Sequence, residues 1–175
     1  MKNLDEENVQ DEAPKRPNFL VFLLVLSSIS VFLLLYGSLS AVFEGPKSAE
    51  YMEEIIAEQN EQLAELKTLT GKDDGVLIEA VESSVNLTIY TNDEVFYSFH
   101  FLSILQALLG IAAIVFMFKL RKIGFHLYVG YCILPIIVSY ALFPAAYISN
   151  FMILGTVLIS GLFCLLYGLN LKHMK

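Results

Sequence analysis

The sequence predicts an all-α integral membrane protein: a four-transmembrane-helix bundle with an extracytoplasmic helical insertion between its first and second membrane helices. Three observations lead to this prediction. The 175-residue chain is 56% hydrophobic and only 17% charged, which is less charge than a water-soluble domain usually carries. Four long apolar runs contain no Asp, Glu, Lys or Arg, and no acidic residue follows Glu94. The charges outside these runs are sorted by sign.

Each apolar run is long enough to cross roughly 30 Å of hydrocarbon as a helix, which satisfies its own backbone hydrogen bonds where water is absent. The first run is longer than the ~7–15 apolar residues of a cleaved signal peptide, so we interpret it as an uncleaved anchor. The predicted organisation is a disordered cytoplasmic tail at 1–17, membrane helices at 18–43, 95–118, 123–148 and 151–171, an acidic extracytoplasmic helical segment at 44–94, a cytoplasmic basic link at 119–122, an outer turn at 149–150 and a cytoplasmic tail at 172–175.

The basic residues predict the orientation of the chain in the membrane. Eight of the eleven Lys and Arg residues fall in the link 119–122 or near the two ends of the chain. Because cytoplasmic loops are enriched in these residues, both termini are predicted to be cytoplasmic and the segment 44–94 to lie outside, in an inner or plasma membrane. Tyrosines suit the membrane interfaces: we expect Tyr36, Tyr97 and Tyr147 at the outer one, and Tyr128 and Tyr167 at the inner one.

The segment 44–94 is predicted to contain two helices. A heptad-like stripe predicts the first helix after Pro46, and Gly71 predicts its end. Asp73 or Asp74 would cap a second, shorter helix. The stripe consists of Met52, Ile56, Gln59, Leu63 and Leu66, and the second helix would carry Leu77, Ile78, Val81 and Val85 on one face.

Two local patterns are predicted between this second helix and the next membrane helix. Residues 86–90 alternate polar and apolar, which favours an extended conformation. Thr91 and Glu94 have the spacing of a capping box, which predicts the start of the membrane helix at 95–118.

The first outer helix also carries an acidic face, formed by Glu54, Glu58, Glu61 and Glu65. Like charges at these spacings repel each other, so the isolated helix would be marginally stable. We therefore expect its apolar stripe to pack, either on Leu77, Ile78 and Val81 of the same chain or on a second copy. The acidic face is then a solvated surface, or it binds a basic partner or divalent ions.

The second membrane helix contains three polar residues that form a candidate intramembrane site: His100, Ser103 and Gln106. An ionisable residue within a membrane helix is a functional candidate by default. The alternative for His100 is a neutral imidazole that is hydrogen-bonded to a neighbouring helix. His100 and Asp93 provide too few ligands for a zinc site, so no metal and no cofactor are predicted.

Small residues recur along two membrane helices, and they predict close helix packing in lipid. They are Ala107 and Gly110 in the second helix, and Thr156, Ser160, Cys164 and Gly168 in the fourth. Pro135 should kink or loosen the third helix. The expected result is a compact bundle in which the third and fourth helices form a tight hairpin.

The sequence lacks the motifs of several function classes. It contains no Gly-rich phosphate loop, no Ser/His/Asp set, no Cys-x-x-Cys and no paired intramembrane carboxylates. The four-span layout is similar to that of claudins, but the Trp and paired Cys of their first outer loop are absent here. Tetraspanins place their large loop between spans three and four, where this chain has only two residues. Small multidrug transporters carry a glutamate in span one, and the first span of this chain has none. No family is therefore identified.

The leading hypothesis is a non-enzymatic accessory or scaffold subunit that presents the acidic outer helix to a partner. Besides the lipid bilayer, that partner would be another membrane or extracytoplasmic protein, or a second copy of the chain, and no nucleic acid is expected. The alternative is a small transporter or channel component with a polar path near His100, Ser103 and Gln106.

Overall fold

The computed structural model of the protein describes residues 17–70 and 75–175, and all regular structure in these two ranges is helical. The predicted tail at 1–17, apart from Pro17, lies outside the described residues. So do Gly71, the predicted helix end, and Asp73 and Asp74, the predicted caps.

Among the described residues, four helices are long and apolar enough to cross a membrane, which indicates a multi-pass membrane protein. They are α1 (Asn18–Glu44), α4 (Phe96–Phe118), α5 (Lys122–Leu142) and α6 (Asn150–Gly168). A short 3-10 helix, η2 (Ala145–Tyr147), precedes α6, and another, η3 (Leu171–His173), follows it.

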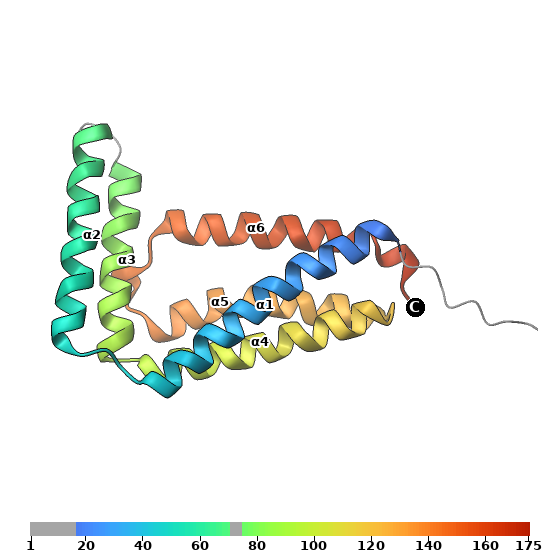
Figure 1. Cartoon of the computed structure of the whole chain (residues 1–175). Helices are drawn as coiled ribbons and strands as arrows, with labels where there is room; N and C mark the ends of the chain where they lie inside the picture. The colour runs from blue at the N-terminus through green and yellow to red at the C-terminus, as the bar shows by residue number, and fades with distance from the viewer. Residues whose placement is uncertain (1–16, 71–74) are drawn as a thin grey trace, which may run out of the picture.

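The two remaining helices, α2 (Ala49–Thr70) and α3 (Gly75–Asp93), form a hairpin. The hairpin lies crosswise at one end of the four apolar helices, while the start of α1 and the C-terminus lie at the other end (Figure 1). The C-terminus is held there by two backbone hydrogen bonds, from Lys122 N to Lys175 O (2.9 Å) and from Lys175 N to Leu120 O (2.7 Å). This arrangement gives the molecule a hairpin end and a terminal end.

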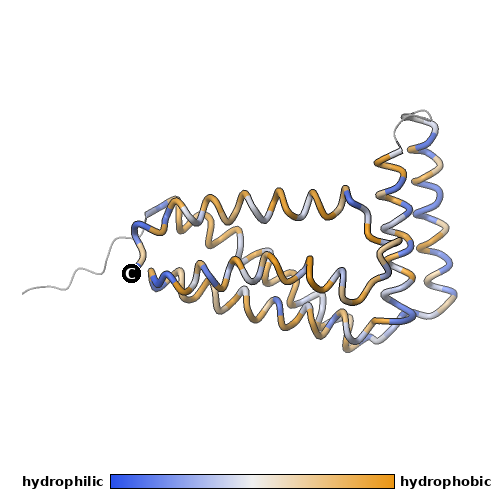
Figure 2. The backbone as a smooth tube through the Cα atoms, turned by 180° about the vertical axis from the view of Figure 1, so that it is seen from behind, coloured by the Kyte–Doolittle hydropathy of each residue, from blue (hydrophilic) through white to orange (hydrophobic). Residues whose placement is uncertain are grey.

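The two ends differ in polarity and in charge. Hydrophilic residues gather on the hairpin and at the terminal end, whereas the long helices between them are mostly hydrophobic (Figure 2). Every acidic residue in the described part of the chain lies between Glu44 and Glu94. The terminal end carries the basic residues Lys119, Arg121, Lys122, Lys172 and Lys175.

The main buried core lies in the half of the bundle near the terminal end. Helix α4 packs along both α1 and α5, and small residues such as Ala113 let these helices approach each other. The buried members of this core are Leu20, Leu23, Leu24, Ala113, Met117, Leu120, Tyr128, Cys132, Tyr167 and Met174.

Two expectations about the last two apolar helices are corrected. Helix α5 ends at Leu142, not at Ile148, because Pro144 disfavours a helical conformation of Phe143, which is extended (φ −105°, ψ 144°). The expected tight hairpin of the third and fourth membrane helices is wrong as well. Helix α5 packs mainly on α4, and only 6% of the 18-residue apolar stretch of α6 is buried. The connection through η2 is long enough to let α6 stand apart from α5 (Figure 1).

Two local predictions before α4 are also wrong. Residues 86–90 are helical, because α3 continues through them to Asp93. Thr91 does not cap α4, because its hydroxyl donates a hydrogen bond to the carbonyl of Leu87 (2.6 Å) within α3. Val95 occupies the N-cap position of α4 and provides no side-chain cap. Hydroxyl groups bonded to the carbonyl four residues earlier are compatible with a continuous helix.

Candidate functional site

The apolar stripe of α2 packs against α3 of the same chain. Met52 and Leu63 on α2 are buried, and so is Val85 on α3. Gln59 is the polar member of the stripe, and its Oε1 atom is buried without a hydrogen-bond partner in the described structure. Leu77, at the start of α3, remains 39% exposed. The stripe is therefore used within the chain, with one unsatisfied polar atom in the seam.

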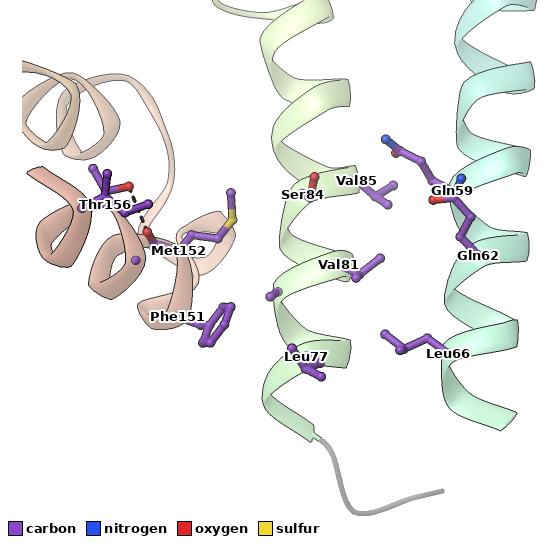
Figure 3. A pocket seen from close by; sticks show the side chains of 13 residues that line it. Gln59, Gln62, Leu66, Leu77, Val81, Ser84, Val85, Phe151, Met152 and Thr156 are labelled. Carbon is purple, nitrogen blue, oxygen red and sulfur yellow. Dashed lines mark hydrogen bonds between the residues drawn. The ribbon is translucent and has the colours of Figure 1, made fainter. Parts of the chain in front are cut away.

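A cavity of about 660 Å³ lies beside this seam and extends to the start of α6. Val81 and Val85 of α3 point toward Gln59 of α2, while Phe151 and Met152 of α6 lie on the other side of α3 (Figure 3). The cavity is lined by Gln59, Gln62, Leu66, Leu77, Ala80, Val81, Ser84, Val85, Phe151, Met152, Gly155, Thr156 and Ile159.

The acidic face of α2 points away from the seam. Glu54, Glu58, Glu61 and Glu65 are all exposed. The two ion pairs found among the described residues join Lys47 to Glu44 and Lys67 to Glu82, and neither involves these four glutamates. The four carboxylates therefore form a solvent-facing acidic surface, which we call the acidic face.

His100 lies near the start of α4, at the hairpin end of the bundle. Its imidazole packs against the rings of Phe96 and Phe99, with ring centroids 4.6 Å and 5.4 Å away. Its Nδ1 atom is buried and has no hydrogen-bond partner among the described residues. The hydrogen bond to a neighbouring helix that the sequence suggested for a neutral His100 is thus not made by Nδ1.

Ser103 and Gln106 lie further along α4, and each makes a hydrogen bond to a backbone carbonyl. The Ser103 hydroxyl donates to the carbonyl of Phe99 in its own helix (2.9 Å). The Gln106 side-chain amide donates to the carbonyl of Tyr131 in α5 (3.5 Å). Pro135 has no N–H group, so the backbone carbonyl of Tyr131, four residues earlier, lacks its usual helical donor. Gln106 therefore supplies the donor that Pro135 removes.

A second cavity, of about 580 Å³, lies between the hairpin and the apolar helices and borders His100. We call it the His100 cavity. Its lining includes His100 but neither Ser103 nor Gln106, so the three polar residues of α4 do not share it. It is lined by Ala41, Lys47, Tyr51, Met52, Ile55, Ser84, Leu87, Thr88, Thr91, Asn92, Phe96, Phe99, His100, Ser139, Phe143 and Met152.

The small residues singled out by sequence occupy two environments. Ala107 and Gly110 are buried on α4, and a Cβ atom at Gly110 would lie 2.8 Å from Val31 of α1 and 3.0 Å from the ring of Tyr131. On α6 the packing is looser, because a Cβ atom at Gly168 would meet only the Phe125 ring, at 4.0 Å. Thr156, Ser160 and Cys164 are half-buried along the same helix.

Sequence reasoning missed a buried polar cluster that joins α1, α5 and α6. The Tyr167 hydroxyl donates to Ser27 Oγ (2.9 Å), and Tyr128 Oη lies 3.4 Å from the same atom. The two tyrosine rings are 4.6 Å apart and are buried between the helices. Their place at the inner membrane interface stays a prediction. The available signal was Ser27, which follows Leu20, Leu23 and Leu24 and precedes Val31 at helical spacing.

No protein-family model, curated protein or solved structure matches the chain. Within residues 17–70 and 75–175, no group of three or more His, Cys, Asp or Glu side chains is placed to hold a metal ion. The candidate surfaces are therefore the acidic face of α2 and the His100 cavity.

Proposed function

We propose that the protein is a non-enzymatic membrane protein that acts as an accessory or scaffold subunit and presents the acidic face of α2 to a partner. The observation that carries the proposal is that the two faces of α2 have different surroundings. Its apolar stripe packs on α3, so the helix does not need a partner to bury that stripe. Its four exposed glutamates are left without an ion pair among the described residues.

The charge distribution supports an outward-facing hairpin. The basic residues of the terminal end include Lys119, Arg121 and Lys122 in the α4–α5 link, and acidic residues of the described chain are confined to the segment from Glu44 to Glu94. Under the positive-inside rule, the terminal end is cytoplasmic and the hairpin extracytoplasmic. The proposed assignment is an inner or plasma membrane protein with both termini in the cytoplasm.

The chemistry of the acidic face favours a partner with a basic contact surface. Opposite charges steer association and select the partner more than they add affinity. Binding through Glu54, Glu58, Glu61 and Glu65 should therefore weaken as ionic strength rises, because exposed charges are screened within about 10 Å at 0.1 M salt.

The alternative, a small transporter or channel component, has less support. Ser103 and Gln106 are hydrogen-bonded to backbone carbonyls, and neither lines the cavity that reaches His100. A polar path would need these groups to face a shared cavity. Of these three residues of α4, only His100 has a buried polar atom without a hydrogen-bond partner in the described structure, and it lies at the hairpin end of the helix.

Purification from native membranes in a mild detergent tests the proposal. The first variant replaces Glu54, Glu58, Glu61 and Glu65 with Gln. A matched control makes the same change in charge on and just after α3, through Glu79→Gln, Glu82→Gln, Asp93→Asn and Glu94→Gln. We expect the wild type and the control to retain a co-purifying partner and the first variant to lose it. An identical mass for all three proteins would contradict the proposal.

A further inference from the structure

Among the described residues, five Lys and Arg side chains gather at the terminal end of the bundle. The turn from α4 into α5 provides three of them, and the segment that follows α6 provides two. All five are exposed: Lys119, Arg121, Lys122, Lys172 and Lys175. We call this cluster the basic platform.

The two segments that form the basic platform are fixed to each other. Backbone hydrogen bonds run from Lys122 N to Lys175 O (2.9 Å) and from Lys175 N to Leu120 O (2.7 Å). Met174 and Leu120 are buried in the same core. Leu120 has a left-handed conformation (φ 56°), which is uncommon for leucine, and its burial and the hydrogen bond to its carbonyl hold it there. The cations of both segments are therefore presented together, on a folded surface.

The positive charge of the basic platform is not matched by acidic side chains of the described chain. All of these lie between Glu44 and Glu94, toward the hairpin end (Figure 1). The two ion pairs among the described residues are at that end as well. The carboxylate of Lys175 offsets one of the five charges. The platform therefore has a surplus of positive charge that an anionic ligand can neutralise.

The cations lie next to apolar side chains that are exposed at the helix ends. Phe118 precedes Lys119 and is 48% exposed, and Ile123 follows Lys122 and is 54% exposed. Leu169, just after α6, is 66% exposed. On a membrane helix such apolar side chains face hydrocarbon, and cations beside them reach the head-group region. This proximity favours a lipid head group over an acidic protein or a nucleic acid.

We propose that the basic platform binds the phosphate groups of anionic phospholipids, with the acyl chains beside Phe118, Ile123 and Leu169. Clusters of Lys and Arg next to the ends of membrane helices attract anionic lipids, and both side chains donate charge-assisted hydrogen bonds to phosphate oxygens. The platform lies at the opposite end of the molecule from the acidic face, so this proposal holds or fails independently of the proposed partner.

Photo-crosslinking of the full chain in phosphatidylcholine nanodiscs tests the proposal. The probe is phosphatidylglycerol with a diazirine near the start of one acyl chain, and the matched probe is phosphatidylcholine with the same chain. Phosphatidylglycerol adducts should map near Phe118, Ile123 and Leu169, should saturate, and should be competed by unlabelled phosphatidylglycerol but not by soluble glycerol phosphate. Near Phe43 of α1, which is 87% exposed at the hairpin end, the two probes should label alike.

Matched variants at exposed positions make the test specific. Arg121→Gln with Lys172→Gln removes one cation from each segment, and the preference for phosphatidylglycerol over phosphatidylcholine should fall roughly fivefold for each charge removed. Arg121→Lys with Lys172→Arg keeps both charges and should keep the preference.

The control variant, Lys47→Gln with Lys67→Gln, makes the same change in net charge at the hairpin end and should leave the preference unchanged. Equal labelling by the two probes at the terminal end would overturn the proposal and leave an acidic protein as the candidate ligand. Competition by glycerol phosphate, wild-type labelling of the Arg121→Gln and Lys172→Gln variant, or an equal loss in the control variant would overturn it as well.

Discussion

The side-chain amide nitrogen of Gln106 lies 3.5 Å from the carbonyl oxygen of Tyr131, the oxygen that Pro135 leaves without a helical donor. A carbonyl without a donor is costly where water is absent, and membrane helices that contain proline depend on neighbouring groups to satisfy it. The contact therefore gives Gln106 a structural role between α4 and α5.

A double-mutant cycle tests this role of Gln106. Gln106→Leu should destabilise the protein by about 1–2 kcal/mol, because it leaves the Tyr131 carbonyl unsatisfied. In a Pro135→Ala background the restored N–H can bond to Tyr131, and the same substitution should cost close to nothing. Unfolding in mixed micelles measures both differences. An equal loss of unfolding free energy in the two backgrounds would show that Gln106 does not replace the donor that Pro135 lacks.

The close approach of α1, α4 and α5 at Gly110 gives a second prediction. Gly110→Ala places a Cβ atom 2.8 Å from Val31 and 3.0 Å from Tyr131, so it should destabilise the bundle by about 1–3 kcal/mol. Gly155→Ala on α6 is the matched control, because its Cβ atom would meet nothing within 4 Å. Thermal unfolding in detergent should show a lower midpoint for the first variant and an unchanged or higher one for the second. The reverse order would refute the packing described for α4.

The unsatisfied Oε1 of Gln59 predicts a stabilising substitution in the hairpin. Gln59→Leu removes a buried acceptor without a partner and extends the apolar stripe, so it should stabilise the hairpin by about 1–3 kcal/mol. Gln62→Leu, at an exposed position of the same helix, should change stability by less than about 0.5 kcal/mol. Hydrogen exchange of the α2 and α3 amides reports both effects. Faster exchange in Gln59→Leu would mean that the amide is satisfied in solution.

The orientation of the hairpin is tested by labelling single cysteines with a membrane-impermeant maleimide. The native thiols are first removed by Cys132→Ala and Cys164→Ala. In this background Ser48→Cys, at an exposed position before α2, should be labelled on intact cells. Lys172→Cys, at the terminal end, should be labelled only after permeabilisation. The opposite pattern would reverse the proposed topology.

The helical class and the four apolar helices were predictable, because long runs without charged residues have few alternatives in structure. The course of the chain from Asn86 to Glu94 was not, because its alternation and its Thr-x-x-Glu pattern are short signals. The surrounding helix α3 overrides them, with Thr88 and Thr91 bonded to carbonyls of their own helix.

The candidate site was predictable only in part. Spacing alone placed Glu54, Glu58, Glu61 and Glu65 on one face of a helix. It also grouped His100 with Ser103 and Gln106, but the role of Gln106 depends on Tyr131 in another helix. The contact between Tyr167 and Ser27 joins the two ends of the sequence, and such long-range pairs leave no periodic signal.

The most direct test of the central claim is crosslinking from the acidic face in native membranes. A photoreactive residue at Ala57, an exposed position of α2 between Glu54 and Glu61, should yield one discrete adduct. The same residue at Asn86, exposed on α3, is the positional control and should yield none. We predict that the adduct weakens at high salt and disappears when Glu54, Glu58, Glu61 and Glu65 are replaced with Gln. No adduct, or an adduct that survives this replacement unchanged, would contradict the proposal that the acidic face binds a partner.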